Sequence, residues 1–313
     1  MEKQSAKKQR AKRTTTKVFD LLFKDLMHLS NKAVILFING LFGTKYPLDS
    51  KITYLEQEIV NENLNSLIRD IVLQINGFTH HIEAQINFDT DMMIRIFRYG
   101  FEAGLLQKKT TGNIRTIEFP QARIIYFEGS KKTPKQQTLR LKFPDETWYD
   151  YKVDTFNLLD HSVDELEKQG LAILLPFYVL KMRRQVQKAK SEDELKRLSQ
   201  QLKTLLDELL GTIDRLNKNG KINEKDVEYI VFGMERLYKE LFSQYKELAE
   251  GDIMLEEKLD YYSDKFVEQG EKKAKLEMAK NLLAMGDSIE KVAKVTKLPL
   301  KTIKALQNKQ KVA

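Results

Sequence analysis

The sequence contains no cysteine and only four histidines, and these shortages limit its chemistry. Without cysteine there are no disulfide bonds, no thiolate catalysis and no zinc site built from cysteine ligands. So few histidines make a site with several histidine ligands improbable. Carboxylates are therefore the expected ligands of any bound metal, which favours a hard ion such as Mg²⁺ or Mn²⁺. A chain without cysteine also suits the reducing cytoplasm, where we expect the protein.

Long apolar runs are lacking as well. A helix that spans a bilayer needs about 20 apolar residues in succession. The longest apolar run here, 171–180, is shorter and contains Pro176. The basic N-terminus is not followed by an apolar segment, so no secretory signal is expected. We therefore expect no membrane partner.

Positive charge is in excess: 53 Lys and Arg residues stand against 45 Asp and Glu, a net charge of +8. Residues 1–13 alone hold six basic residues and one Glu. We expect residues 1–14 to form a basic disordered tail, which could hold phosphates without specificity. A basic balance is compatible with nucleic acid as a partner, although many basic proteins have none.

The first half of the chain has the pattern of an α/β domain. Apolar residues recur at helical spacing over 17–41, and again over 91–109. Short segments rich in β-branched and aromatic residues predict strands over 52–60, 67–75, 78–86, 122–127, 138–143 and 148–157. The strands before and after the second helix can pair in parallel, because a helical crossover permits it.

Beyond about residue 160 the pattern is helical. It predicts helices over 162–187, 192–216, 223–248, 288–296 and 299–307. We expect an α/β domain over 15–185, a helical bundle or coiled-coil extension over 186–264, and a helical tail over 265–313. The tail resembles a helix-turn-helix, but a helical hairpin that caps the bundle explains the same pattern. The extension could form a homodimer, or its charged faces could simply be solvated.

The pair Asn76-Gly77 between two strand patterns is the strongest local signal in the chain. Asn-Gly favours a two-residue type I′ turn, which fixes the register of the hairpin. Ile75 then faces Phe78, and counting back along both strands places Asp70 opposite Glu83.

This register places the two carboxylates on one face of the hairpin, with Cβ atoms about 4.5 to 5.5 Å apart. Like charges so close favour a proton or a cation between them. A divalent ion would meet that need, and it could polarise a phosphoryl oxygen and lower the pKa of a bound water. The alternative is that both acids are solvated neighbours on an open sheet face.

The order helix, three strands, helix, strand resembles the core of PD-(D/E)xK nucleases, the restriction-endonuclease-like fold. Within that superfamily, several short motifs are similar to those of the bacterial recombination-promoting nuclease / putative transposase family. They are Asp20-Leu21-Leu22-Phe23-Lys24, Arg69-Asp70-Ile71, His81-Ile82-Glu83-Ala84-Gln85, and Arg95 with Tyr99. The likeness covers residues 15–185, followed by a charged helical tail over 278–306.

The resemblance implies a divalent-metal-dependent endonuclease that hydrolyses DNA phosphodiester bonds, linked to recombination or a mobile element. Asp70 and Glu83 would bind Mg²⁺ or Mn²⁺, and Gln85 would position the attacking water. The superfamily usually has lysine at the position of Gln85. Glutamine can orient a water by hydrogen bonds, but it brings no positive charge.

Four further residues have two interpretations each. Asp20 could add a carboxylate to the site, or it could pair with Lys24 at i,i+4 spacing. Arg95 and Tyr99 share a helix face and could contact a phosphate or brace the site. Alternatively, Tyr99 packs on the sheet while Arg95 reaches water. His81, two residues from Glu83, could carry protons or fill space, and His80 is expected in the core.

Two other functions compete with the nuclease. One is a non-catalytic DNA-binding protein derived from a degenerate nuclease, which the basic charge and the missing lysine favour. The other is a helical assembly module with a vestigial α/β domain.

Overall fold

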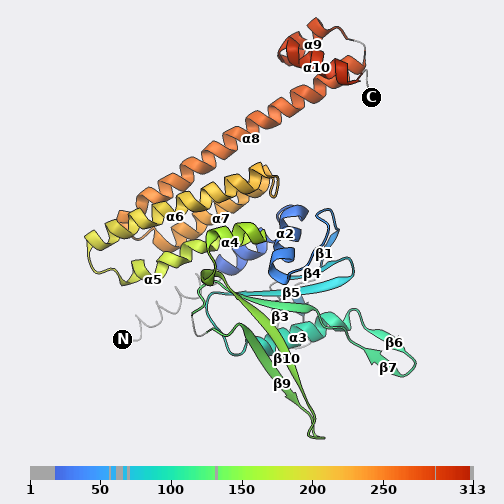
Figure 1. Ribbon diagram of the computed structural model, residues 1–313, viewed down its shortest axis with the longest axis vertical. Helices are drawn as coiled ribbons and strands as arrows, with labels where there is room; N and C mark the ends of the chain where they lie inside the picture. Colours follow the sequence, from blue (N-terminus) through green and yellow to red (C-terminus); the bar gives the residue numbers. More distant parts are fainter. Residues whose placement is uncertain are drawn as a thin grey trace. The chain divides into compact units, whose positions relative to one another are not determined.

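The computed structural model describes residues 18–55, 58–60, 66–68, 71–130, 133–285 and 287–310. The chain divides into two compact units, Met1–Glu256 and Glu257–Ala313, and the boundary falls inside helix α8 (Ala249–Ala284). The first unit combines a mixed sheet with helices, and the second is helical (Figure 1). Mixed α/β architecture with a helical C-terminal part, expected from the sequence, is confirmed.

The first unit contains a six-stranded mixed sheet (Figure 1). In spatial order its strands are β1 (Ile52–Tyr54), β4 (Ile71–Ile75), β5 (Phe78–Gln85), β8 (Gln121–Tyr126), β10 (Trp148–Asn157) and β9 (Gln136–Lys142). The three strands β5, β8 and β10 run parallel, and the other neighbours are antiparallel. Helix α3 (Met92–Leu105) connects β5 to β8, so the parallel pairing expected across a helical crossover is confirmed.

The β4–β5 hairpin has the predicted register. Asn76 and Gly77 both have positive φ, 50° and 86°, as a type I′ turn requires. Pairing runs from Ile75↔Phe78 to Ile71↔Ile82, and the next residue on β5 is Glu83. The predicted partner of Glu83, Asp70, lies outside the described residues.

The prediction of one strand over 52–60 is wrong. β1 ends at Tyr54, and the second half of the segment, β2 (Glu58–Val60), pairs with β3 (Ser66–Ile68) in a separate two-stranded sheet. The segment expected as one strand over 67–75 is likewise shared between β3 and β4, which belong to different sheets. Helix α3 (Met92–Leu105) ends four residues before the predicted end at 109, and a second ribbon, β6 (Lys109–Thr111) with β7 (Ile114–Thr116), follows it.

Helices cover both faces of the sheet. On one face Met92, Met93 and Ile96 of α3 pack against Ile124 and Tyr126 of β8. On the other face Phe127, which follows β8, stacks on Phe177 with ring centroids 4.1 Å apart. That face also receives the helical segment 18–26 and α2 (Asn31–Phe42), whose aromatic rings join the same cluster.

The β9–β10 hairpin extends beyond the neighbouring strands (Figure 1). Its distal end is aromatic and exposed: Trp148 is 62% exposed and Tyr149 63%. The guanidinium of Arg140 lies 5.7 Å from the centroid of Trp148 and pairs with Asp150 at 2.8 Å.

A single helix over 162–187 was expected, and this prediction is wrong. Helix α4 (Val163–Gln169) ends at Gly170, whose φ of 74° is left-handed. The apolar run that follows forms the 3-10 helix η2 (Ala172–Val179), in which all eight residues are buried, and only then does α5 (Leu180–Lys188) begin.

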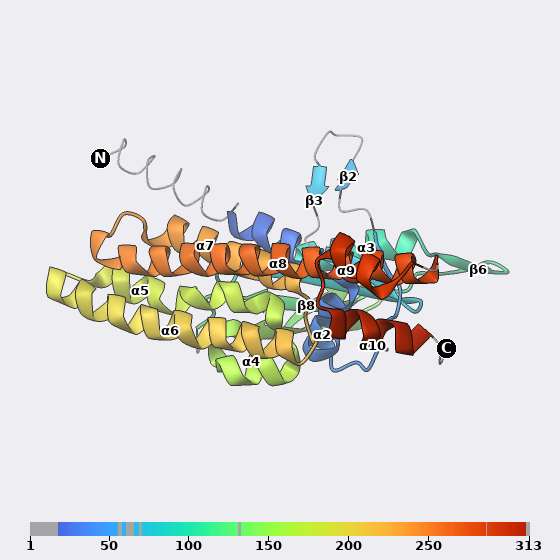
Figure 2. The same ribbon diagram turned by 90° about the horizontal axis from the view of Figure 1, so that it is seen from above.

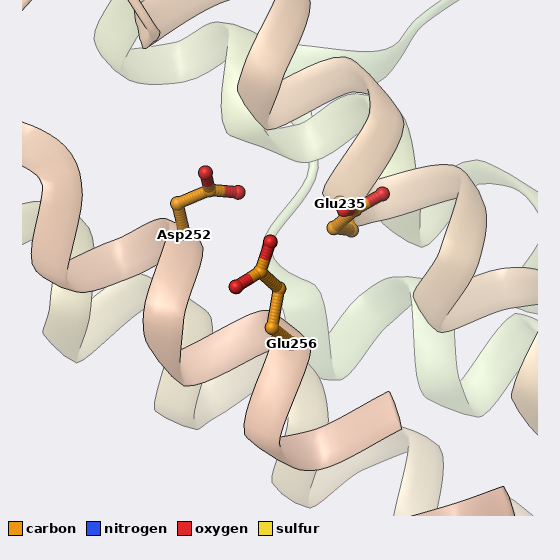
Figure 3. A group of neighbouring side chains, drawn as sticks. All are labelled: Glu235, Asp252 and Glu256. Atoms are coloured by element: carbon orange, nitrogen blue, oxygen red, sulfur yellow. The ribbon is translucent and has the colours of Figure 1, made fainter. Parts of the chain in front are cut away.

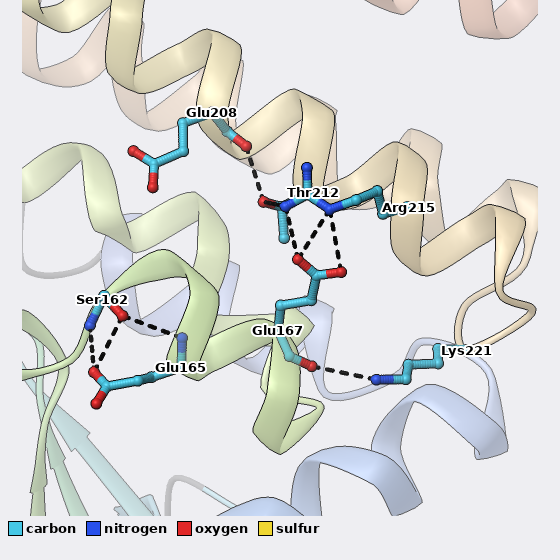
Figure 4. Close-up of polar contacts among 7 residues, drawn as sticks. All are labelled: Ser162, Glu165, Glu167, Glu208, Thr212, Arg215 and Lys221. Atoms are coloured by element: carbon cyan, nitrogen blue, oxygen red, sulfur yellow. Dashed lines mark hydrogen bonds and ion pairs between the residues drawn. The ribbon is translucent and has the colours of Figure 1, made fainter.

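Two long helices and a short one lie between α5 and α8. Helices α6 (Glu192–Lys218) and α7 (Glu224–Phe242) run side by side (Figures 1 and 2), and η3 (Lys246–Leu248) follows them. Arg215 of α6 forms a double hydrogen bond with the carboxylate of Glu167 in α4, and Thr212 accepts a further bond from Arg215 at 2.8 Å (Figure 4). These contacts fix α4 to α6.

The second unit has a small core of its own. Ala279 of α8, Val292 of α9 (Ile289–Thr296) and Ile303 of α10 (Leu300–Gln310) are fully buried together. The two short C-terminal helices expected from the sequence are confirmed, and both pack on the end of α8. Among the described residues, no helix combines the length and the apolar character needed to cross a bilayer.

Candidate functional site

Glu83 is a buried carboxylate near the end of β5. Its side chain lies on the face that α3 covers, and the residue is only 3% exposed. The alternative of a solvated acid on an open sheet face is therefore wrong for this residue. A buried charge requires a partner, because removing it from water is costly.

His81 provides one partner for Glu83. The two side chains point to the same face, and His81 Nε2 lies 3.1 Å from Glu83 Oε1. At this distance a protonated Nε2 donates a hydrogen bond to the carboxylate. The sequence left the role of His81 open, and the structure assigns it a contact with the candidate metal ligand.

Tyr99 of α3 lies close to His81. Its ring centroid lies 6.0 Å from that of His81, and the residue is 7% exposed. Arg95, one turn earlier, instead reaches the surface, where its Nη2 donates to Asp89 Oδ2 at 2.8 Å. This is the arrangement in which Tyr99 packs on the sheet and Arg95 extends to water.

Gln85 lies at the edge of the same region. It is the last residue of β5 and is half-buried. Its main-chain oxygen accepts a hydrogen bond from Phe127 N at 2.8 Å, which ties the ends of β5 and β8 together. Asp20 is not brought to these residues by any observed contact; it pairs with Lys24 Nζ at 3.1 Å, as the i,i+4 spacing suggested.

His80, on the opposite face of β5, is a core histidine as expected. It is 1% exposed, and its Nε2 lies 2.9 Å from the hydroxyl of Tyr46. Burial lowers the pKa of His80 to about 4, so the ring is neutral at pH 7.

A second polar group, which the sequence did not reveal, lies beyond the carboxyl ends of β5 and β8. Glu128 is 6% exposed, and Arg183 and Arg184 of α5 approach its Oε2 at 3.6 and 3.9 Å. Burial raises the pKa of Glu128, and the two guanidinium groups oppose that shift. Arg184 Nη2 also donates to Asn87 Oδ1 at 3.2 Å and to the Glu128 carbonyl at 3.1 Å. No periodicity links α5 to these loops, which explains why sequence reasoning missed the group.

The chain matches no family model, no curated protein and no solved structure. The resemblance to PD-(D/E)xK nucleases therefore remains a prediction. Any assignment of function rests on the arrangement of the site residues.

A cluster of three acids in the helical part is a candidate metal site by composition. Glu235, Asp252 and Glu256 lie close enough for their oxygens to share an ion (Figure 3). Lys239, however, already supplies a cation: its Nζ contacts Glu235 and lies 2.8 Å from Glu256 Oε1 and 3.8 Å from Asp252 Oδ1. Its hydrogen bonds with Glu235 and Glu256 raise the pKa of Lys239. The cluster is therefore better explained as an ion-pair network between α7 and the start of α8.

Proposed function

We propose that the protein is a divalent-metal-dependent DNA endonuclease of the PD-(D/E)xK type, linked to recombination or to a mobile element. The observation that carries the proposal is the buried carboxylate of Glu83 at the carboxyl end of a central strand. Such a group is costly to maintain for stability alone, and ligands of α/β sheets commonly bind at this end of the strands.

The topology supports the proposal. A helix over 18–26 precedes the antiparallel strands β1, β4 and β5; α3 then crosses over to β8, which runs parallel to β5. This is the order expected of the nuclease core. The proposal extends the observed hairpin register by one residue, so that Asp70 would face Glu83.

The available donors suit a hard cation. Glu83 offers carboxylate oxygens, and Asp70 would add a second carboxylate, the side-chain ligand type that suits Mg²⁺. Glu83 and Asp70 would hold the ion, which supplies Lewis acidity at the scissile phosphate. His81 orients the Glu83 carboxylate, and the Gln85 amide would orient the attacking water by hydrogen bonds.

A non-catalytic DNA-binding protein is the second candidate. Two observations favour it: Gln85 adds no positive charge, and Glu83 is 3% exposed and already in contact with His81. In that case Glu83 and His81 would form a structural pair between β5 and α3.

Nicking of supercoiled plasmid in Mg²⁺ tests the proposal. We expect Glu83→Gln to slow nicking by about a hundredfold or more, because several kcal/mol of transition-state stabilisation depend on the bound ion. Glu118→Gln is a matched control, since Glu118 is exposed and pairs with Lys109 on a distant ribbon. The proposal fails if Glu83→Gln nicks as fast as the wild type, or if chelation of the metal has no effect. DNA binding without nicking would support the second candidate.

A further inference from the structure

Helix α5 carries four cationic side chains and no acid in its nine residues. Three of the cations, Lys181, Arg184 and Lys188, are exposed and recur at spacings of three and four residues, so they share one face of the helix. The opposite face is anchored by the buried residues Met182 and Val186.

Contacts with the loops that follow β5 and β8 hold Arg184 at the edge of the sheet where β5 ends with Gln85. Arg184 donates to Asn87, which follows Gln85 by two residues, and to the carbonyl of Glu128, which follows the end of β8. Both of these hydrogen bonds are donated by Nη2 of Arg184. The Arg184 side chain is nevertheless 54% exposed, so it is held through Nη2 and still reaches solvent.

The charge balance of the group is positive. Glu128 is the buried acid beneath Arg183 and Arg184, so two guanidinium groups share one carboxylate. The ammonium of Lys181 lies 5.2 Å from the ring centroid of Tyr178, a cation–π contact that limits its motion. An anionic ligand would therefore meet cations whose positions are partly set in advance.

We propose that the exposed face of α5 binds the phosphodiester backbone of DNA, with Arg184 contacting a phosphate close to the site of cleavage. This inference rests on the proposed function, which places cleavage at Glu83. Lys181 and Lys188 lie seven residue steps apart, about 10 Å along the helix axis. This length equals the rise of about three nucleotides in one strand of duplex DNA. Arginine also fits phosphate geometry with two parallel hydrogen bonds.

The basic surface of α5 does not continue onto the start of α6, which is acidic. Its first turn carries Glu192, Asp193 and Glu194, which repel phosphate. The bound backbone therefore runs from α5 toward the carboxyl edge of the sheet and not along α6.

Binding of a fluorescein-labelled 20-base-pair duplex, followed by anisotropy in EDTA, tests the proposal without requiring cleavage. The variant combines Lys181→Ala, Arg184→Ala and Lys188→Ala. We expect at least a tenfold weaker affinity at 0.1 M salt. The slope of log affinity against log salt should fall by about 2 to 3, because about one counterion fewer is released for each lost phosphate contact.

The matched control removes the same charge elsewhere, through Lys218→Ala, Lys225→Ala and Lys246→Ala. These lysines are exposed on the helical part of the same unit. We expect less than a threefold change in affinity for this control. Far-UV circular dichroism of both triple variants shows whether they are folded.

Each result separates the two proposals. Equal losses in the two triple variants, an unchanged affinity of the α5 variant, or no DNA binding by the wild type would each overturn the inference. Glu83→Gln removes no cation, so it should not weaken DNA binding. If the α5 variant binds weakly while Glu83→Gln still nicks normally, the surface is supported and the nuclease site is refuted. If the α5 variant keeps full affinity while Glu83→Gln abolishes nicking, the nuclease site is supported and the α5 surface is refuted.

Discussion

Acidification should destabilise the protein through His80. This side chain is 1% exposed between Phe42, whose ring centroid is 4.6 Å away, and the hydroxyl of Tyr46. Burial disfavours the imidazolium and lowers the pKa of His80 from 6.5 to about 4. Between these two pKa values, His80 is protonated in the unfolded chain but neutral in the folded protein. Stability is therefore lost as the pH falls from about 6.5 to about 4.

The size of the effect follows from the pKa difference. A gap of about 2.5 pH units corresponds to about 3.4 kcal/mol when fully expressed. At pH 5 the unfolded histidine is almost fully protonated and the folded one is mostly neutral. The contribution lost between pH 7.5 and pH 5 is then about 2 kcal/mol.

Urea unfolding at the two pH values, followed by far-UV circular dichroism, measures this loss. Other groups titrate over the same range, so the wild type is compared with His80→Gln. We expect the free energy of unfolding of the wild type to fall by about 2 kcal/mol more than that of the variant. His161→Gln, which removes a histidine whose side chain is 29% exposed, should behave like the wild type. If the wild type and His80→Gln lose the same free energy, burial of a neutral His80 is not the cause.

Three further predictions concern other parts of the molecule. Gly40→Ala should cost more than about 2 kcal/mol and lower the melting temperature, because a Cβ there would overlap the carbonyl oxygen of Gln169; an unchanged melting temperature would contradict this close approach. Millimolar Ca²⁺ should leave the melting temperature of the wild type unchanged but raise that of Lys239→Met, in which the acidic cluster has lost its cation. Gln85→Lys should speed Mg²⁺-dependent nicking about tenfold by adding a positive charge near the phosphate, and a slower variant would count against that role.

The hairpin could be predicted in detail because its signal is local. Asn76-Gly77 adopts positive φ at both residues, and that turn alone sets every pair down to Ile71↔Ile82. The parallel pairing of β5 with β8 followed from one intervening helix. Both inferences needed only neighbouring residues and rules of chain geometry.

The wrong strand predictions concerned the choice of pairing partner. The segment 52–60 has the composition of one strand, but its two halves pair with different strands, and composition does not encode the choice of partner. For the segment 162–187, by contrast, residues within the segment itself indicate that the helix is interrupted. Gly170 and Pro176 both argue against one continuous helix, but the helical spacing of the flanking residues outweighed them in the prediction.

The candidate site was predictable in part. The alternation of side chains placed Glu83 and His81 on one face, and the structure brings them to 3.1 Å. Burial of that face under α3 was not foreseen, because the face carries many polar residues. The pairing of Asp70 with Glu83 lies outside the described residues and stays a prediction.

The exposed end of the β9–β10 hairpin determines what intrinsic tryptophan fluorescence reports about this protein. Trp148 is the sole tryptophan of the sequence and is 62% exposed. Its indole is already hydrated before denaturation, so its spectrum will shift little when the interior melts. Quenching of Trp148 will instead report events at the hairpin tip. A melting curve measured by tryptophan fluorescence will therefore report changes at the tip of the β9–β10 hairpin. Loss of the aromatic packing around Phe127 must be measured with another probe.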